Sequence, residues 1–102
     1  MEKRKPSFDL ERFKRVAGNP ATLDMTRTAL FSAADLGFDF PAVAVLVKTM
    51  QRSMFVKSMT SYADSRQWQD VYHVPAHDGT VIYLKFTNDV VTEFTILSFK
   101  ER

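Results

Sequence analysis

The residues best suited to chemistry in this sequence are five polar side chains in its C-terminal half: Lys57, Gln69, Tyr83, Lys85 and Lys100. Each is on or beside an otherwise apolar segment. Holding charges and hydrogen-bonding groups among Phe, Val, Leu and Ile costs free energy unless something needs them. The lysines supply fixed positive charge, which stabilises negative charge that develops on a phosphate. The combination therefore favours an anionic ligand or substrate.

Each of these residues also has a purely structural interpretation. Lys57 suits the end of a short helix, where its charge interacts favourably with the helix dipole. Gln69 could pair with Tyr83 across two strands and do nothing else. Lys100 could be an edge charge that prevents strands of different molecules from pairing. The residue types alone leave these alternatives open.

These residues are less well suited to proton transfer than to holding a negative charge. Tyr and Lys side chains ordinarily have pKa values near ~10, so neither is a ready base at neutral pH. A neighbouring cation makes either one easier to deprotonate, and Lys57 or Lys85 is the candidate neighbour of Tyr83. His73 is an alternative acid–base group, because strand alternation places it on the face of Gln69. The competing interpretation of His73 is a surface residue next to a turn.

Length and composition limit the fold and the cofactors. The 102 residues predict one domain, residues 1–102, of a size that can bury a single core. There is no cysteine, which excludes disulfides and thiolate metal sites. With only two histidines a zinc site would need carboxylates as well, so we expect no metal and no cofactor.

Charge and hydropathy limit the partners. The net charge of +2 weakly favours an anionic partner such as nucleic acid or an acidic protein. The basic residues near the N-terminus form either a solvated helix face or a phosphate-contacting surface. They are Lys3, Arg4, Lys5, Arg12, Lys14 and Arg15. No apolar run is long enough to span a membrane and no signal-peptide core follows the charged start, so we expect a cytoplasmic protein.

The elements that position these residues change character halfway along the chain. In the first half, apolar residues recur at helical spacing, with capping residues before them and glycine after the first two segments. The expected helices cover about residues 7–17, 24–36, 39–50 and 53–59. The fourth would carry Phe55 and Met59 on its core side and project Lys57 to a different side.

From Trp68 the apolar period changes to two, which is typical of strands. Further strands begin at about Val81 and Val91, with turns at residues 77–79 and 88–89 between them. Consecutive strands with short turns form an antiparallel meander, and the helices must cover one face of it. The sequence therefore predicts an α+β fold whose other face is polar and open and carries Gln69 and Tyr83, with Lys85.

The opposite face of the first strand carries Trp68, Asp70 and Tyr72. We expect Trp68 and Tyr72 to lie in the core rather than to stack on bases. Asp70 is expected to cap a backbone group or pair with a cation rather than to act as a base.

Six segments of the chain resemble the MqsR toxins, in order and with similar spacing. They are Met1-Glu2-Lys3-Arg4, Leu36-Gly37-Phe38-Asp39-Phe40, Lys57-Ser58-Met59-Thr60-Ser61-Tyr62, Trp68-Gln69-Asp70-Val71-Tyr72, Tyr83-Leu84-Lys85 and Ser98-Phe99-Lys100-Glu101. This family, the motility quorum-sensing regulators, consists of messenger-RNA interferases from type II toxin–antitoxin pairs. The resemblance covers essentially the whole chain, and it implies a RelE-like domain with an antiparallel sheet.

The resemblance also implies which residues act. A lysine, a glutamine and a tyrosine are associated with RNA cleavage in the family, and they match Lys57, Gln69 and Tyr83. The implied reaction is metal-independent: the 2′-hydroxyl attacks the neighbouring phosphate, and cations stabilise the charge that develops there.

The remaining candidates are substrate-binding residues. Lys85 and Lys100 match basic positions near the implied site. His73 stands where the resemblance leads us to expect arginine. The hairpin that carries His77 and the segment 41–50 depart from the family pattern, which bears on RNA sequence preference and partner pairing.

As a whole, the resemblance implies a toxin that cleaves free messenger RNA at short GC-containing sites, without the ribosome, and so halts translation. It implies an MqsA-like antitoxin with a zinc-binding domain and a helix-turn-helix domain, and no DNA binding except through that partner. The alternatives are a non-catalytic module that binds RNA or protein, and a ribosome-dependent nuclease. Growth arrest on expression of the chain alone separates an active toxin from a binding module.

Overall fold

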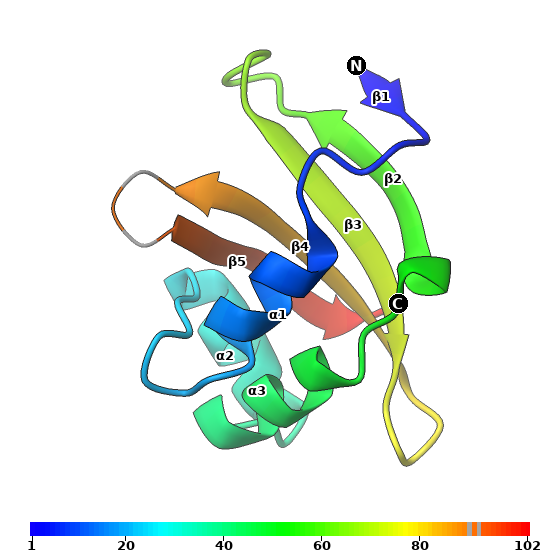
Figure 1. The fold of residues 1–102 in the computed structure, drawn as a ribbon. Helices are drawn as coiled ribbons and strands as arrows, with labels where there is room; N and C mark the ends of the chain where they lie inside the picture. Colours follow the sequence, from blue (N-terminus) through cyan, green and yellow to red (C-terminus); the bar gives the residue numbers. More distant parts are fainter. Residues whose placement is uncertain (90, 92) are drawn as a thin grey trace.

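The fold is one antiparallel sheet with helices packed on one of its faces (Figure 1). The computed structural model describes residues 1–89, 91 and 93–102. The strands follow one another in the sheet in sequence order: β1 (Glu2–Lys3), β2 (Phe55–Thr60), β3 (Trp68–Pro75), β4 (Val81–Asp89) and β5 (Glu93–Glu101). The helices are α1 (Leu10–Ala17), α2 (Arg27–Asp35) and α3 (Phe40–Lys48). This architecture confirms the predicted α+β class.

Each helix begins directly after a side chain that can accept its first free amides. Asp9 accepts hydrogen bonds from the amides of Glu11 and Arg12, and Asp39 accepts one from Ala42. The third helix therefore starts where its sequence predicts. The first starts at Leu10 rather than near Ser7, because Asp9 is its cap.

The second helix begins three residues later than predicted, after the cap Thr26. Residues 24–26 are instead extended beside β5. The Ile96 amide donates to the Asp24 carbonyl over 3.0 Å, and the Thr26 amide donates to the Ile96 carbonyl over 3.0 Å. A long-range pairing of this kind cannot be recognised from the local sequence. The prediction from helical spacing alone therefore began the helix too early.

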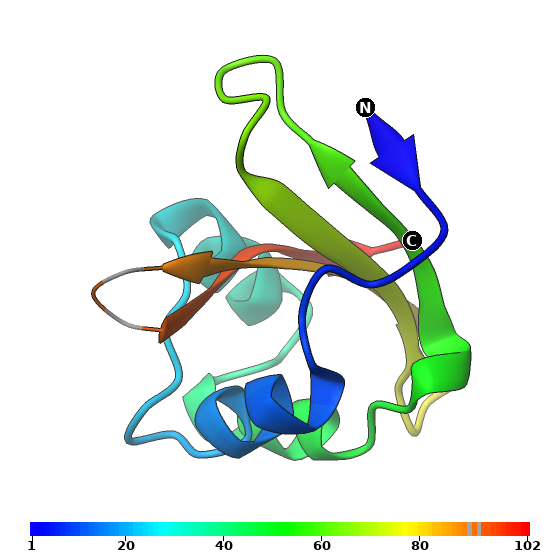
Figure 2. The same ribbon diagram turned by 45° about the horizontal axis from the view of Figure 1, so that its top comes forward.

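The covered face of the sheet holds the core. Phe13 of α1 stacks on Phe86 of β4 with ring centroids 3.7 Å apart, and Tyr72 of β3 also stacks on Phe86. The fully buried apolar residues of β4, Ile82, Leu84 and Phe86, alternate along the strand, and those of α3 recur at helical spacing, as the sequence pattern predicts. Figure 2, turned from the first view, shows α1 and α3 together on this side of the sheet.

The predicted helix at residues 53–59 is wrong. A short 3-10 turn, η1 (Arg52–Met54), leads into strand β2, which pairs with β3. The register shifts between Phe55 and Lys57, so Val56 is an extra residue in the strand. Such a bulge breaks the two-residue alternation and leaves Phe55 and Met59 at a helix-like spacing.

Strand β1 is also absent from the sequence-based prediction. It is two residues long, and it pairs with β2 so that Glu2 opposes Met59 and Lys3 opposes Ser58. The Thr60 amide donates to the Met1 carbonyl over 3.0 Å. A strand this short and charged has no recognisable pattern, since its amides and carbonyls rather than its side chains hold it in the sheet.

The hairpins are close to prediction, with one difference. The first turn lies at residues 76–80, where Asp78 accepts from the Thr80 amide and Gly79 has a φ of 90°. The second does not begin at residue 88, because β4 continues to Asp89. Within the described part of the chain, no single helix is long and apolar enough to cross a membrane. Helices α2 and α3 meet that criterion only as a pair bent by 90°.

Candidate active site on the open face of the sheet

The six candidate residues all lie on the face of the sheet away from the helices. Opposed residues on neighbouring strands share a face. One row across the sheet runs through Lys57, Val71, Lys85 and Ser98. The next row runs through His73, Tyr83 and Lys100. Gln69 precedes Val71 by two residues on β3 and is therefore on the same face.

The row through Lys57 corrects its expected position on a helix. The bulge at Val56 turns Lys57 onto the open face and the next residue, Ser58, onto the covered face. There the Ser58 hydroxyl is 2.6 Å from that of Ser7. Lys57 therefore lies on a strand and not on a helix.

Glu2 is a member of this face that the sequence did not reveal. Its partner in the sheet is Met59, two residues beyond Lys57, so its side chain projects to the same side. The Lys57 ammonium donates to Glu2 Oε1 over 3.0 Å. This hydrogen bond, followed by the charge of Lys57, lowers the pKa of Glu2, which is therefore ionised.

Lys85 lies in the middle of the positive charge. Burial, followed by the charges of Lys100 and Lys57, lowers its pKa from the usual 10.5. A burial-depressed lysine with two cations for neighbours is unfavourable in the free protein. An anion bound among the three ammonium groups would offset the free-energy cost of burying the Lys85 charge and the repulsion between the three charges.

Tyr83 is flanked by an imidazole and an ammonium group. Lys100 Nζ lies 5.2 Å from the centre of its ring, and the His73 ring centre lies 5.9 Å from it. Lys100 is thus a cation beside the tyrosine that sequence reasoning, which named Lys57 or Lys85, did not consider. Burial, followed by the charge of Arg102, lowers the pKa of His73, which leaves it neutral at neutral pH. A neutral imidazole has one nitrogen free to accept a proton.

Gln69 is buried, with 7% of its surface exposed. Its side-chain oxygen Oε1 has no hydrogen-bond partner among the described residues. On the neighbouring strand β4, Tyr83 opposes His73 rather than Gln69, so the alternative in which Gln69 only pairs with Tyr83 across two strands is wrong. Because a buried acceptor without a partner is costly, this oxygen is suited to receive a hydrogen bond from a bound molecule.

The opposite face of β3 has a structural role. Asp70 accepts hydrogen bonds from the amides of Ser7 and Phe8 over 3.0–3.1 Å, as the backbone-capping expectation required. Tyr72 is fully buried, and burial followed by the charge of Asp70 raises its pKa to about 12. Trp68 is half-buried, with Lys3 Nζ 4.1 Å from its ring centre. These residues do not belong to the candidate site.

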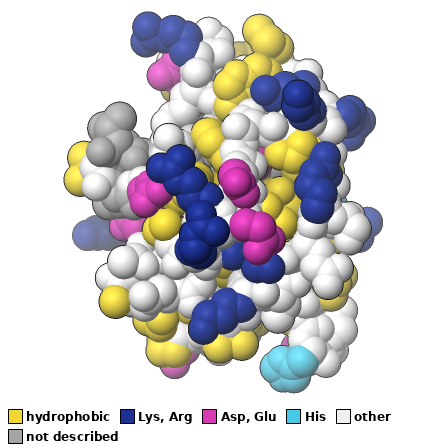
Figure 3. All heavy atoms as spheres, viewed as in Figure 1, with side chains coloured by type: hydrophobic (Ala, Val, Ile, Leu, Met, Phe, Trp, Pro, Cys, Tyr) yellow, Lys and Arg dark blue, Asp and Glu magenta, His cyan; other side chains and the backbone are white. Residues whose placement is uncertain are grey.

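The N-terminal basic residues lie among acidic residues. Figure 3 shows Lys and Arg side chains interspersed with Asp and Glu over α1 and the segment before it. Arg12 pairs with Glu93 over 2.7 Å, and Lys14 donates to the Met50 carbonyl over 2.8 Å. The contacts of Arg12 and Lys14 within the protein favour the solvated-face interpretation for these two residues.

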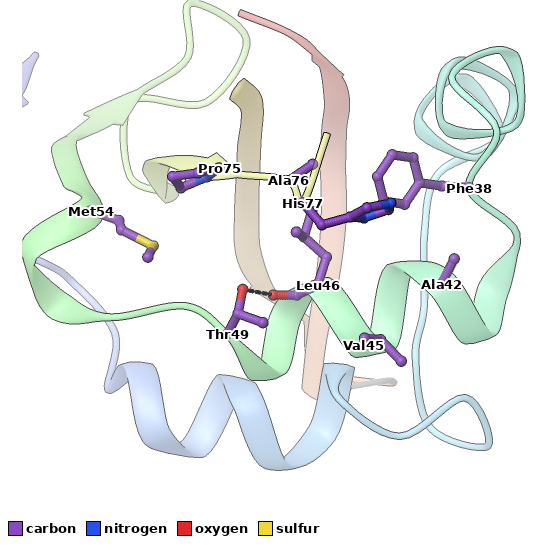
Figure 4. A pocket seen from close by; sticks show the side chains of 9 residues that line it. All are labelled: Phe38, Ala42, Val45, Leu46, Thr49, Met54, Pro75, Ala76 and His77. Carbon is purple, nitrogen blue, oxygen red and sulfur yellow. Dashed lines mark hydrogen bonds between the residues drawn. The ribbon is translucent and has the colours of Figure 1, made fainter. Parts of the chain in front are cut away.

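An apolar cavity of about 570 Å³ lies elsewhere, between α3 and the β3–β4 hairpin (Figure 4). Leu46 and Val45 of α3 contribute to one wall, and Pro75, Ala76 and His77 form the other. The structure thus places His77 away from the open face. Among the described residues, no three His, Asp or Glu side chains gather as a metal-binding group.

The open face therefore combines three ammonium groups, an amide with a free acceptor, a phenol and a neutral imidazole. The ammonium groups can hold a phosphate and the charge that develops on it. The imidazole can accept a proton, and the phenol can donate a hydrogen bond. Together these groups can bind and activate a phosphodiester.

Comparison with known proteins shows the family to which the chain belongs. The family model described as "Motility quorum-sensing regulator, toxin of MqsA" matches residues 5–101. The chain is 41% identical to the mRNA interferase toxin MqsR of Escherichia coli (strain K12), over 102 residues that cover all of both chains. A match of this length includes every candidate residue of the open face, and the chain accordingly belongs to the MqsR toxin family.

Proposed function

We propose that this chain is the toxin of a type II toxin–antitoxin pair, an endoribonuclease that cleaves messenger RNA and so halts translation. The main observation behind this proposal is that three lysines share one face of the sheet with an amide and a phenol. These residues are Lys57, Lys85, Lys100, Gln69 and Tyr83. Family membership and the name of the E. coli relative, an mRNA interferase, support the same activity.

The proposed reaction is transesterification at phosphorus. The RNA 2′-oxygen forms a bond to the adjacent phosphorus while the bond from phosphorus to the 5′-oxygen breaks. The 2′-proton passes to a base, and a second proton reaches the leaving 5′-oxygen. The products are a 2′,3′-cyclic phosphate and a 5′-hydroxyl, and no metal takes part.

In this scheme the lysine cations contribute most of the transition-state stabilisation. Lys57 and Lys85, which share a row, hold the phosphate and stabilise the extra charge of the phosphorane. Lys100 adds charge from the next row and orients Tyr83. Gln69 positions the nucleotide through its free oxygen.

Two groups are placed to move protons. The neutral imidazole of His73 accepts the 2′-proton, and the phenol of Tyr83 delivers a proton toward the 5′-oxygen. Their rings are neighbours, with centres 5.9 Å apart, so one phosphodiester can reach both. The arrangement supplies positioning and electrostatics without a histidine pair.

The substrate we propose is free, single-stranded messenger RNA, cut at short GC-containing sites without the ribosome. This follows from the resemblance to the family, and the open face fits it, since it is not enclosed by other elements in Figures 1 and 2. A few lysines on one face suit a short stretch of backbone.

We further propose a cytoplasmic location and an antitoxin partner. The matched family description names the toxin of MqsA, which supports an MqsA-like partner. By resemblance, that partner would carry a zinc-binding domain and a helix-turn-helix domain, and DNA binding would occur only through it.

The deciding experiment incubates the purified chain with ribosome-free, end-labelled messenger RNA in EDTA. We expect specific cuts with 5′-hydroxyl ends. Lys57→Ala and Tyr83→Phe should lose about a hundredfold or more in rate, the scale of a lost transition-state contact. Lys48→Ala, which removes an exposed lysine of α3, is the matched control and should cut like wild type.

A folded wild-type chain that leaves naked RNA intact contradicts the free-RNA proposal. Adding translating ribosomes to the same reaction then separates the alternatives. Cuts that require ribosomes identify a ribosome-dependent nuclease, and no cuts in either condition identify a non-catalytic binding module.

A further inference from the structure

A second hollow adjoins the open face at its β1 edge. It has a volume of about 400 Å³, within the range of small-molecule sites. Met1 and Glu2 line it from the N-terminal strand, and Met59 and Tyr62 line it from the end of β2 and the loop beyond. It is continuous with the candidate site because Glu2 is hydrogen-bonded to Lys57.

One cross-strand row that borders this hollow carries two acceptors, of which Glu2 lines the hollow and Gln69 does not. That row runs through Glu2, Met59 and Gln69. Glu2 is an ionised carboxylate whose Oε1 accepts from Lys57, and no described residue donates to its Oε2. Gln69 Oε1 is buried and has no partner among the described residues. A ligand held here must therefore offer donors.

The surface between the acceptors is suited to a flat ring. Met59, between them, has a flexible, polarisable thioether that packs well against aromatic faces. Tyr62 is a fully exposed aromatic residue on the rim of the hollow. Exposed aromatic side chains next to a nucleic-acid site stack on unpaired bases.

Among the RNA bases, only guanine presents two adjacent donors, its N1–H and its 2-amino group. Cytosine and adenine each offer one amino group on that edge, and uracil offers one imino group. A carboxylate with two oxygens pairs with adjacent donors through two parallel hydrogen bonds.

We propose that this hollow is a guanine-binding subsite in which Glu2 accepts from the guanine N1–H and 2-amino groups, beside the phosphate-binding Lys57. The inference rests on the proposed nuclease function and specifies which base that site reads. The hydrogen bond between Glu2 and Lys57 would then couple base recognition to phosphate binding, so that cleavage occurs next to a guanine.

The test measures binding without cleavage. Short, single-stranded 2′-fluoro oligoribonucleotides have no 2′-hydroxyl nucleophile, so they bind but cannot be cut. A matched pair contains either guanosine or inosine, which lacks only the 2-amino group, and fluorescence anisotropy gives each Kd. Wild type should bind the guanosine oligonucleotide about tenfold more tightly, the effect of one hydrogen bond to a charged group.

The variant Glu2→Gln places an amide opposite the base donors and should reduce that preference to about one. Glu11→Gln, an exposed glutamate of α1, is the matched control and should keep the full preference. Tyr62→Ala should weaken binding of both oligonucleotides by about tenfold or more, and Tyr62→Phe should retain binding because the ring remains.

Equal affinity of wild type for guanosine and inosine overturns the subsite, and so does a guanosine preference that survives in Glu2→Gln. The cleavage experiment above tests the nuclease separately. Specific cutting without a guanosine preference keeps the nuclease and rejects the subsite. A guanosine preference without cutting keeps the subsite and rejects the nuclease.

Discussion

Lys85 shows at the scale of a single residue that the open face is not arranged for stability. Its ammonium group is partly buried, and Lys57 and Lys100 are the neighbouring charges that lower its pKa. Selection for stability alone would favour an apolar side chain at this position, because burial and like charge both oppose the ammonium. The unfavourable charge therefore indicates a function that needs it.

We predict that Lys85→Met separates stability from activity. The variant should be as stable as wild type or more stable, by up to about 1 kcal/mol, since it removes a desolvated charge. RNA cleavage should fall by about a hundredfold, since a cation at the phosphate is lost. Thermal unfolding and end-labelled RNA cleavage measure the two effects. A clearly destabilised variant would show that Lys85 is a structural residue.

The stability difference between wild type and Lys85→Met should depend on pH. The folded chain has the lower pKa, so the unfolded chain binds this proton more tightly. The penalty is fully present below the folded pKa and disappears as the pH rises past the ordinary value of 10.5. The stability gain of Lys85→Met should therefore shrink at alkaline pH.

Sequence reasoning located the open-face residues because alternation along a strand needs only local information. Gln69, Tyr83 and Lys85 were placed correctly on this basis. Glu2 and Arg102 were missed. Each acts on a residue far along the chain, Glu2 on Lys57 and Arg102 on His73, and no local spacing reveals such a pair.

At the scale of elements, Asp70 links the N-terminal segment to the sheet. It accepts the amides of Ser7 and Phe8, between β1 and α1, while being fully buried itself. These bonds fix the segment that delivers Glu2 to β2. The covered face of β3 thus supports the open face indirectly.

We predict that Asp70→Ala destabilises the protein by about 2–4 kcal/mol, because it leaves two backbone donors without their acceptor in a buried place. Urea unfolding measures the change. Asp35→Ala, at the exposed end of α2, is the control and should change stability by less than about 0.5 kcal/mol. If Asp70→Ala changes the free energy of unfolding as little as Asp35→Ala does, the prediction is wrong, and water replaces the carboxylate as acceptor for the amides of Ser7 and Phe8.

Strand β2 marks the limit of what the sequence could predict about elements. Its bulge disturbs the alternation, and its buried positions, Ser58 and Thr60, are polar rather than apolar. Ser58 is tolerated there because its hydroxyl contacts that of Ser7, which a reader of the local sequence cannot know. The strands β3 and β4 were predicted correctly, because the alternation in their sequences is recognisable locally.

At the scale of the whole molecule, the net charge of +2 is small, and the charge that matters is concentrated on one face. Two basic residues of α1, Arg12 and Lys14, contact Glu93 and the Met50 carbonyl. RNA should therefore meet the open face through few ionic contacts. Binding of single strands releases roughly 0.7 counterion for each phosphate that is neutralised.

We predict a shallow salt dependence. With Lys57, Lys85 and Lys100 as the contacts, the logarithm of the binding constant should fall against the logarithm of salt with a slope of about −2. Lys100→Ala should reduce the slope by about 0.7, whereas Lys48→Ala should leave it unchanged. Anisotropy titrations of an uncleavable oligonucleotide from low to moderate KCl provide the slopes. An unchanged slope in Lys100→Ala would exclude Lys100 from phosphate contact.

The short strand β1 has one more consequence, which concerns association between molecules. It occupies part of the outer edge of β2, with Met1 accepting from Thr60 and the Arg4 guanidinium donating to the Val56 carbonyl. Without this cover, β2 would present a row of unpaired amides and carbonyls, a template for a strand from another copy. The segment that brings Glu2 to the candidate site also covers part of this edge, so its loss would expose unpaired backbone groups of β2 as well as remove a recognition group.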